Sequence, residues 1–208
     1  GGDRNDNFRA DVIAFESPTS LTCLTDSPGW SPRVNHTSAV FRGKIWILGG
    51  YSTDGATNDV WCSRDGTSWT QVTAAADWSP RSRHQSVTHN GEMWVLGWND
   101  VWRSSDGATW HLATDSPPWG KRLGYVACAF DDKIWVFGGA ASGRLHNDVW
   151  YSADGTSWTL AVHSAPWAPR GMAGVAVHDS KLWILGGSGD GLYYNDCWYS
   201  NNGIEWNR

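Results

Sequence analysis

The sequence NDVWYSADGTSW, from Asn147 to Trp158, decides the fold of this chain because close copies of it recur. The copies are NDVWCSRDGTSW (58–69), NDVWRSSDGATW (99–110) and NDCWYSNNGIEW (195–206), and a worn copy, ADVIAFESPTSL, occupies 10–21. The last residues of successive copies lie 48, 41, 48 and 48 positions apart. A spacing of this size predicts a repeat architecture. Within each full copy, the Asp-Gly or Asn-Gly pair predicts a turn between two short strands.

A second unit separates the copies, and it reads WSPRVNHTSAVFRGKIWILGG in residues 30–50. It returns in residues 78–98, 119–139 and 167–187. Each of these units has two strand-like runs joined by a two-residue turn, at Arg42-Gly43, Asn90-Gly91, Asp131-Asp132 and Asp179-Ser180. The second run is nearly continuously apolar, as in Lys44 to Leu48, which is typical of a strand buried on both faces.

Each repeat is therefore predicted to contain four short strands. The first strand follows the Arg of the WxPR sequence, the second ends at Gly-Gly, the third carries Val-Trp, and the fourth begins at the last Trp. No helical periodicity is present. A sheet with two apolar faces cannot bury both faces alone, so successive sheets must stack, and radial stacking with the first strand innermost predicts an all-β propeller.

These features resemble the kelch repeat, whose period is about 50 residues. The resemblance rests on Arg-x-x-His (Arg33/His36 and Arg81/His84), on the strand that ends in Gly-Gly and on the distant Trp. It covers essentially all 208 residues and implies a kelch-type β-propeller with four-stranded antiparallel blades. The departures are Tyr125 and Ala173 in the His position, and Trp98 in place of a second Gly. The SxDGxxW turn also resembles the sialidase Asp-box, although one residue is missing between Asp and Gly.

The spacing predicts the blade boundaries. Residues 1–26 would be the third and fourth strands of a preceding blade, followed by blades at 27–73, 74–114, 115–162 and 163–208, the last of them cut in its fourth strand. Because Gly1-Gly2 precede Asp11 by the same spacing as Gly49 precedes Asp59, we expect a segment of a longer kelch-type array. The ring is then incomplete in this chain, and self-association through the incomplete ring is expected.

Composition excludes two classes of partner. The net charge is −5 and only four of the 16 basic residues are Lys, so no nucleic-acid partner is expected. No apolar run approaches the roughly 18 residues that a membrane span needs.

Sixteen of the 17 Trp fall in four repeating positions, which indicates core packing. The cysteines, Cys23, Cys62, Cys128 and Cys197, have no metal-ligand spacing and are expected to be small buried apolar residues, with disulfides between neighbouring repeats as the alternative.

Successive strands run in opposite directions, so their connections lie alternately on two faces of the repeat. The fourth-to-first corners and the second-to-third loops share one face, called here the loop face, and the first-to-second and third-to-fourth turns share the other, the turn face. The loop face carries variable stretches, so a binding site is expected there. Its candidate binding residues are Tyr51, Trp98, His146, Tyr193 and Tyr194. The aromatic side chains could stack on a sugar or a peptide, or pack against neighbouring loops.

Four corner arginines, Arg33, Arg81, Arg122 and Arg170, converge on the same face. In kelch adaptor proteins, arginines at this corner bind acidic peptides, so the resemblance implies an anion-binding mouth. The alternative, which we favour, is that each Arg pairs internally with the Asp at the start of the third strand: Asp59, Asp100, Asp148 and Asp196.

The expected function is a non-catalytic binding or scaffolding propeller within a larger extracellular or surface protein, with a protein or carbohydrate partner on the loop face. Few Lys and many Ser, Thr, Asn and Trp favour the extracellular setting. Two alternatives remain, a propeller domain of a secreted carbohydrate-active enzyme or oxidase and a structural bead of an extracellular fibre. No catalytic constellation or cofactor is predicted, because the sequence offers no pair of carboxylates at a non-repeating position and no Ser/His/Asp set. No metal site is predicted, because Tyr125 and Ala173 interrupt the position of His36 and His84, and a structural role for these histidines is the better interpretation.

Overall fold

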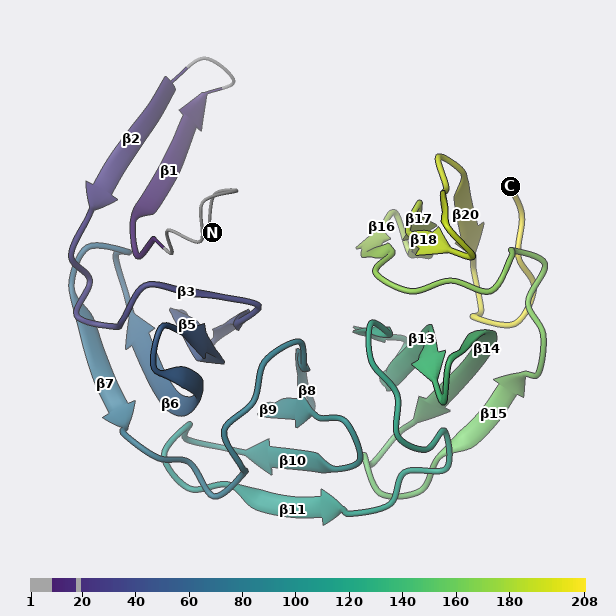
Figure 1. Ribbon diagram of the computed structural model, residues 1–208, viewed down its shortest axis with the longest axis horizontal. Coiled ribbons are helices and arrows are strands. Elements are labelled where there is room, and N and C mark those ends of the chain that lie inside the picture. The colour runs from purple at the N-terminus through teal and green to yellow at the C-terminus, as the bar shows by residue number, and fades with distance from the viewer. Residues whose placement is uncertain (1–8, 18–19) are drawn as a thin grey trace. The chain divides into compact units, whose positions relative to one another are not determined.

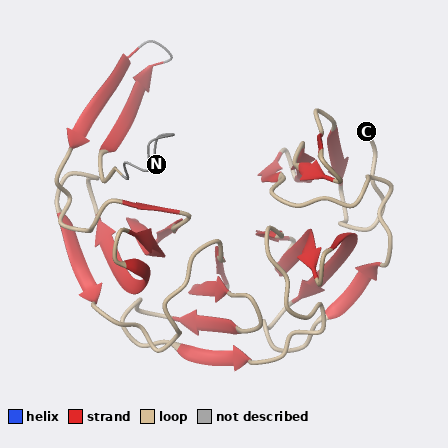
Figure 2. Ribbon diagram, viewed as in Figure 1, coloured by secondary structure: helices blue, strands red, loops and turns tan. Residues whose placement is uncertain are grey.

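The computed structural model describes residues 9–17 and 20–208, which form strands, turns and loops (Figure 1). Within these residues there is no helix (Figure 2), and the predicted all-β class is confirmed. The chain divides into two compact units. Unit 1 comprises the described residues up to His84 together with Ser104–His111, and unit 2 comprises Gln85–Arg103 and Leu112–Arg208.

Every repeat forms an antiparallel sheet whose strands are neighbours in chain order. An N-terminal hairpin consists of β1 (Val12–Ser17) and β2 (Ser20–Thr25). The first sheet contains β3 (Arg33–Val34), β4 (Thr37–Phe41), β5 (Lys44–Ser52), β6 (Gly55–Ser63) and β7 (Trp69–Thr73). The second contains β8 (Gln85–His89), β9 (Glu92–Leu96), β10 (Val101–Ser104) and β11 (His111–Thr114).

The third and fourth sheets repeat the same order. The third contains β12 (Val126–Phe130), β13 (Lys133–Ala141), β14 (Arg144–Ser152) and β15 (Thr159–Val162). The fourth contains β16 (Gly174–His178), β17 (Lys181–Leu185) and β20 (Cys197–Ser200), with a small hairpin of β18 (Ser188–Gly189) and β19 (Leu192–Tyr193) in its second-to-third loop. A single bridge between Tyr199 and Asn207 takes the place of the fourth strand.

The core of unit 2 lies between consecutive sheets. The third sheet packs against the second through Ile134 and Val136 of β13, and against the fourth through Trp135 and Phe137 of the same strand. β13 is thus buried on both faces, as its continuous apolar sequence predicts. The first strand β12 contacts both β8 and β16, so the first strands of three successive sheets are neighbours. This arrangement is that of kelch-type propeller blades.

The two-residue turns between first and second strands are confirmed. Both turn residues have positive φ, for example 48° and 71° at Asn90 and Gly91, and 50° and 52° at Asp131 and Asp132. Positive φ at both central residues is the type I′ geometry that matches the twist of a β-hairpin. The third-to-fourth connection is longer than the two-residue turn that its Asp-Gly pair suggests, since residues 153–158 separate β14 from β15.

The predicted core role of the tryptophans is also confirmed. In each repeat the corner Trp packs edge-to-face against the Trp that follows the SxDG or SxNG turn. The four pairs are Trp30–Trp69, Trp78–Trp110, Trp119–Trp158 and Trp167–Trp206. The interplanar angles lie between 84° and 88°.

The expectation of buried cysteines holds for only part of the set. All four cysteines are free thiols, and Cys62 is buried, but Cys23 and Cys197 are exposed. Burial raises the pKa of the Cys128 thiol to about 12. The prediction is wrong for Cys23 and Cys197 because each lies on a sheet face that no other described sheet covers, a feature that residue type alone does not reveal.

Candidate binding face

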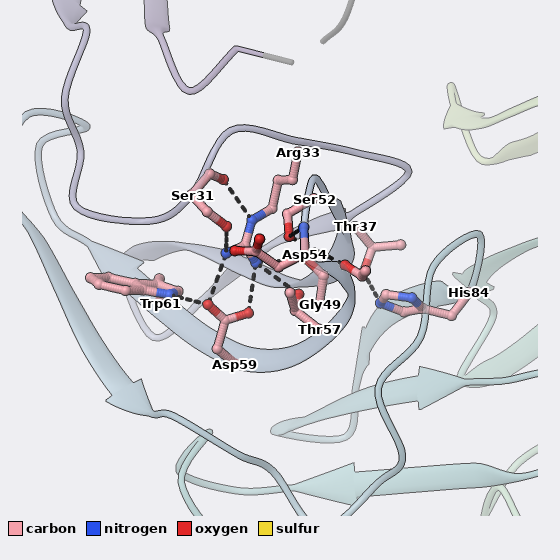
Figure 3. Close-up of polar contacts among 11 residues, drawn as sticks. Ser31, Arg33, Thr37, Gly49, Ser52, Asp54, Thr57, Asp59, Trp61 and His84 are labelled. Atoms are coloured by element: carbon pink, nitrogen blue, oxygen red, sulfur yellow. Dashed lines mark hydrogen bonds and ion pairs between the residues drawn. The ribbon is translucent and has the colours of Figure 1, made fainter. Parts of the chain in front are cut away.

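The corner arginine of the first repeat is part of an internal clamp (Figure 3). Arg33 is buried, and its two terminal nitrogens donate to Asp59 Oδ1 at 2.6 Å and to Asp59 Oδ2 at 2.8 Å. The remaining donors reach the carbonyl of Gly49 at 2.9 Å and the carbonyl and hydroxyl of Ser31, both at 3.0 Å. Trp61 Nε1 donates to the same carboxylate at 2.7 Å. The clamp therefore joins the corner, the end of β5 and the start of β6.

The same clamp recurs in unit 2. Arg122 donates to both oxygens of Asp148, and Arg170 to both oxygens of Asp196, with each arginine buried. The Arg170 guanidinium lowers the pKa of Asp196 to about 2, against the opposing effect of desolvation. Three of the four expected Arg–Asp pairs are thus confirmed. Arg81 is half-buried and donates to the carbonyl and hydroxyl of Ser79. Anion binding by these four arginines stays a prediction, and in three of them the donors are already engaged within the chain.

The position three residues after each corner arginine is also structural. His84 is buried and its Nε2 lies 2.9 Å from Thr37 Oγ1. Burial, with the nearby Arg33 charge, lowers the pKa of His36 to about 4. In the third repeat the Tyr125 hydroxyl oxygen lies 2.7 Å from the carbonyl oxygens of both Leu96 and Gly97, which share its one proton. These side chains therefore fasten the first strand of one repeat to its neighbour.

Backbone hydrogen bonds bring corners and loops together on one face, within each unit. In unit 2, Arg170 N donates to His146 O at 3.0 Å and Gly139 N donates to Arg170 O at 2.8 Å. In unit 1, Arg81 N donates to Thr57 O and Gly50 N to Arg81 O, both at 2.9 Å. Each of these corners thus pairs with the adjoining ends of the second and third strands of the preceding repeat, so the corners and the second-to-third connections lie on one face.

The second-to-third loops differ in length but close in a common way. In the second repeat, Gly97 N donates to Asp100 O at 2.8 Å across two intervening residues. In the fourth, Gly186 N donates to Asp196 O at 2.9 Å across nine. The loop can therefore lengthen without changing how it joins the sheet.

The turn face consists of turns that satisfy their own polar groups. In the third repeat, Asp154 Oδ1 accepts from the backbone N–H of Thr156 and of Ser157, and Ser152 Oγ accepts from that of Gly155. Desolvation acts to raise the pKa of Asp154, but these hydrogen bonds outweigh it and lower the pKa to about 2. The turn in the fourth repeat has the same bonds with Asn202 in place of the Asp. These turns leave little free hydrogen-bonding capacity for a ligand.

Three of the four aromatic residues predicted for the loop face are strongly exposed. Tyr51, Trp98 and Tyr193 expose 47%, 58% and 91% of their surfaces, and they are the strongly exposed aromatic residues among the described part of the chain. Lys121 Nζ lies 5.8 Å from the Trp98 ring. Tyr194 differs, because its ring stacks on the Arg170 guanidinium at 4.2 Å. His146 is half-buried, and burial together with the Arg122 charge lowers its pKa.

Three apolar residues of this face were missed by the sequence analysis. Leu123, Met172 and Leu192 expose 42%, 64% and 61% of their surfaces. Leu123 and Met172 lie one and two positions after a corner arginine, and Met172 has a φ of 54°. The residue two after the arginine has positive φ in every repeat, but it is Asn35, Arg83, Gly124 or Met172, so no shared residue type marks the position in the sequence. Leu192 and Tyr193 line a surface pocket of about 330 Å³ together with Leu145 and residues 188–191.

Within 9–17 and 20–208, no three His, Cys, Asp or Glu side chains gather closely enough to hold a metal ion. The same residues contain no helix suited to crossing a membrane.

Comparison with known protein families identifies the repeat. Residues 32–62, from the first corner through the third strand, match the Kelch motif. No curated protein matches the chain. The other repeats share the strand order of the matched one, and the Arg–Asp clamp recurs in both units, so they are similar to the repeat that matches the Kelch motif.

Proposed function

We propose that this chain, whose repeats resemble the Kelch motif matched at residues 32–62, is a non-catalytic scaffold that binds a protein partner through its loop face. Kelch propellers are typically protein-binding domains, and that coarse role agrees with the fold. The observation that carries the proposal is the exposure of Tyr51, near the end of β5, and of Trp98 and Tyr193, which lie in the second-to-third connections of the second and fourth repeats. Exposed aromatic side chains are the residues most often found at the energetic centre of a protein interface.

The variable loops are held by sheets of nearly repeating structure, and this arrangement supports the proposal. In the first, third and fourth repeats an Arg–Asp clamp with a buried arginine holds both ends of the second-to-third loop, so an exposed side chain there has a defined position. A rigid scaffold lowers the entropic cost of binding. The loop sequences differ among repeats, and they can form an asymmetric surface on a nearly repeating frame. The turns of the other face use their Ser, Asp and Asn side chains internally.

A protein partner is favoured over a carbohydrate by the apolar residues beside the aromatic ones. Leu123, Met172 and Leu192 add branched and flexible apolar surface, which suits side chains of a protein better than a hydroxyl-rich sugar. An extracellular or cell-surface setting is part of the proposal, supported by the low lysine content alone.

Selection of a displayed peptide library on the immobilised chain tests the proposal. Binding of a selected peptide should weaken at least tenfold, or about 1.4 kcal/mol, in Trp98→Ala or Tyr193→Ala. The matched control is Ile204→Ala, because Ile204 is 53% exposed on the turn face. The proposal fails if selected peptides bind both loop variants normally and lose affinity for Ile204→Ala. A parallel screen against glycosides and alcohols would reveal turnover if the chain were an enzyme.

A further inference from the structure

The chain contains the Asn-Gly dipeptide twice, at Asn90-Gly91 and at Asn202-Gly203. Asn-Gly is prone to spontaneous deamidation, because glycine has no side chain to hinder the attack of its backbone nitrogen on the preceding asparagine, and its backbone is conformationally free. Both pairs lie in turns of unit 2. Their sequences are equivalent for this reaction, so the fold around each pair decides which asparagine reacts.

The turn at Asn202-Gly203 holds both reacting groups in hydrogen bonds. Asn202 Oδ1 accepts from the backbone N–H groups of Ile204 and Glu205, both at 2.9 Å. Gly203 N, the nitrogen that would attack, donates to Ser200 Oγ at 2.8 Å. The side-chain amide of the asparagine and the backbone nitrogen of the glycine are therefore fixed by separate partners.

Packing also fixes this turn. Gly203 is buried, and a Cβ on it would approach the Trp135 ring to 2.2 Å, so the glycine backbone lies directly on the ring. For Gly203 N to reach Asn202 Cγ, the turn would have to leave the ring and lose its hydrogen bonds. The fold therefore protects Asn202.

The turn at Asn90-Gly91 has neither form of protection. Both residues are exposed, and a Cβ on Gly91 would meet no atom within 4 Å. Within residues 9–17 and 20–208, no hydrogen bond engages the Asn90 side chain or the Gly91 N–H. The pair forms the tip of the β8–β9 hairpin, next to the terminal strand pair of His89 with Glu92. A local rotation of the backbone at this tip is sufficient to bring Gly91 N to Asn90 Cγ.

We propose that Asn90 is a site of spontaneous deamidation in the folded chain, whereas Asn202 is protected by its turn. Gly91 N attacks Asn90 Cγ, a bond forms between these two atoms, and the bond from Cγ to the side-chain nitrogen breaks. The side-chain NH₂ leaves as ammonia with the proton of the Gly91 amide. Water then opens the cyclic succinimide at either of its carbonyls, which leaves isoaspartate or aspartate at position 90. The net reaction exchanges ammonia for water and adds one carboxylate.

The isoaspartate product changes the hairpin. Its backbone runs through the former side chain, so one carbon is inserted between β8 and β9. A two-residue turn sets the register of its hairpin, and here it pairs Gln85–His89 with Glu92–Leu96. Residues 93–96 of β9 are all buried, so a disturbed register weakens the core of the second sheet. Because this turn lies on the turn face, the site is independent of the proposed loop-face binding.

Peptide mapping by mass spectrometry tests the proposal after the full chain has been incubated, folded, in mildly alkaline buffer. We expect Asn90 to deamidate at least ten times faster than Asn202. The control is the same chain in urea that unfolds it, where the two Asn-Gly pairs should react at similar rates. The proposal is overturned if Asn90 and Asn202 react equally fast in the folded chain, or if Asn90 stays intact there while it reacts in the unfolded chain.

Two variants separate the cause of the protection from the consequence of the reaction. Ser200→Ala removes the acceptor of the Gly203 N–H and should speed the reaction at Asn202, while the rate at Asn90 stays unchanged. Asn90→Gly removes the reactive side chain and keeps a residue suited to positive φ. On incubation, the Tm of the parent chain should fall and that of Asn90→Gly should not. An equal fall in both chains would overturn the assignment of this loss of stability to Asn90.

Discussion

Replacing Arg122 by alanine is expected to destabilise unit 2 by about 3–5 kcal/mol, the cost of leaving a buried charge without its partner. Arg122 donates to both oxygens of Asp148, to Gly138 O and, through two nitrogens, to Trp119 O. After the substitution, Asp148 keeps the bond from Trp150 Nε1 but loses both charge-assisted bonds. The carbonyl oxygens of Gly138 and Trp119 lose donors too, and a buried unsatisfied acceptor costs about 1–3 kcal/mol.

Thermal unfolding followed by circular dichroism measures this effect. For a chain of this size, about 1 kcal/mol lowers Tm by roughly 2–4 °C, so Arg122→Ala should lower Tm by about 6–20 °C. Arg144→Ala is the control, because Arg144 is exposed, and it should change stability by less than about 0.5 kcal/mol. The double variant Arg122→Met with Asp148→Leu should be more stable than Arg122→Ala, since no charge is left buried. If Arg122→Ala and Arg144→Ala unfold at the same temperature, the pair is not a structural clamp.

Three further predictions concern the turns, the acid stability and the thiols. Gly155→Ala should cost several times more stability than Gly143→Ala in urea melts: both glycines have positive φ, but only at Gly155 would the new Cβ meet a ring, that of Trp94. The Arg170–Asp196 pair stabilises the fold fully above the ordinary carboxyl pKa of about 3.9, and this contribution is lost as pH falls through about 2. The urea concentration at the unfolding midpoint should therefore be lower at pH 2 than at pH 5, and the difference should be smaller in Asp196→Asn. In the native chain Cys23 and Cys197 should react with a thiol reagent while Cys62 stays protected, as mass spectrometry of the labelled peptides would show.

Much of the fold was predictable because each repeat provides an independent copy of the same signals. Turn residues such as Asn90-Gly91 and the apolar run of β13 mark strand boundaries locally, and four copies remove the ambiguity of one. The Arg–Asp clamps were predictable for the same reason, since Arg122 and Asp148 recur together as Arg170 and Asp196 do. A contact that occurs in every sheet can be predicted from the sequence, because both of its residues recur at the same spacing.

The features that could not be predicted depend on residues or surroundings that differ from one repeat to the next. The sequence pattern treats Cys197 as equivalent to Val101 and Val149, and only the packing shows that Cys197 is exposed. The exposure of Met172 depends on a left-handed backbone at a position where other repeats have Asn35, Arg83 and Gly124. The identity of the partner depends on loop side chains that have no counterpart in the other repeats.

The way the second-to-third loops close has a consequence for protein engineering. One backbone hydrogen bond, from a glycine N–H to an aspartate carbonyl, joins Gly97 to Asp100 across two residues and Gly186 to Asp196 across nine. Because the same sheet architecture accepts both a short and a long second-to-third connection, this connection is a suitable position for grafting new segments. Randomised segments inserted between Gly97 and Asp100 would vary recognition while the edge-to-face tryptophan pairs and the Arg–Asp clamps of the other repeats keep the fold, which makes the chain a starting point for selected binders.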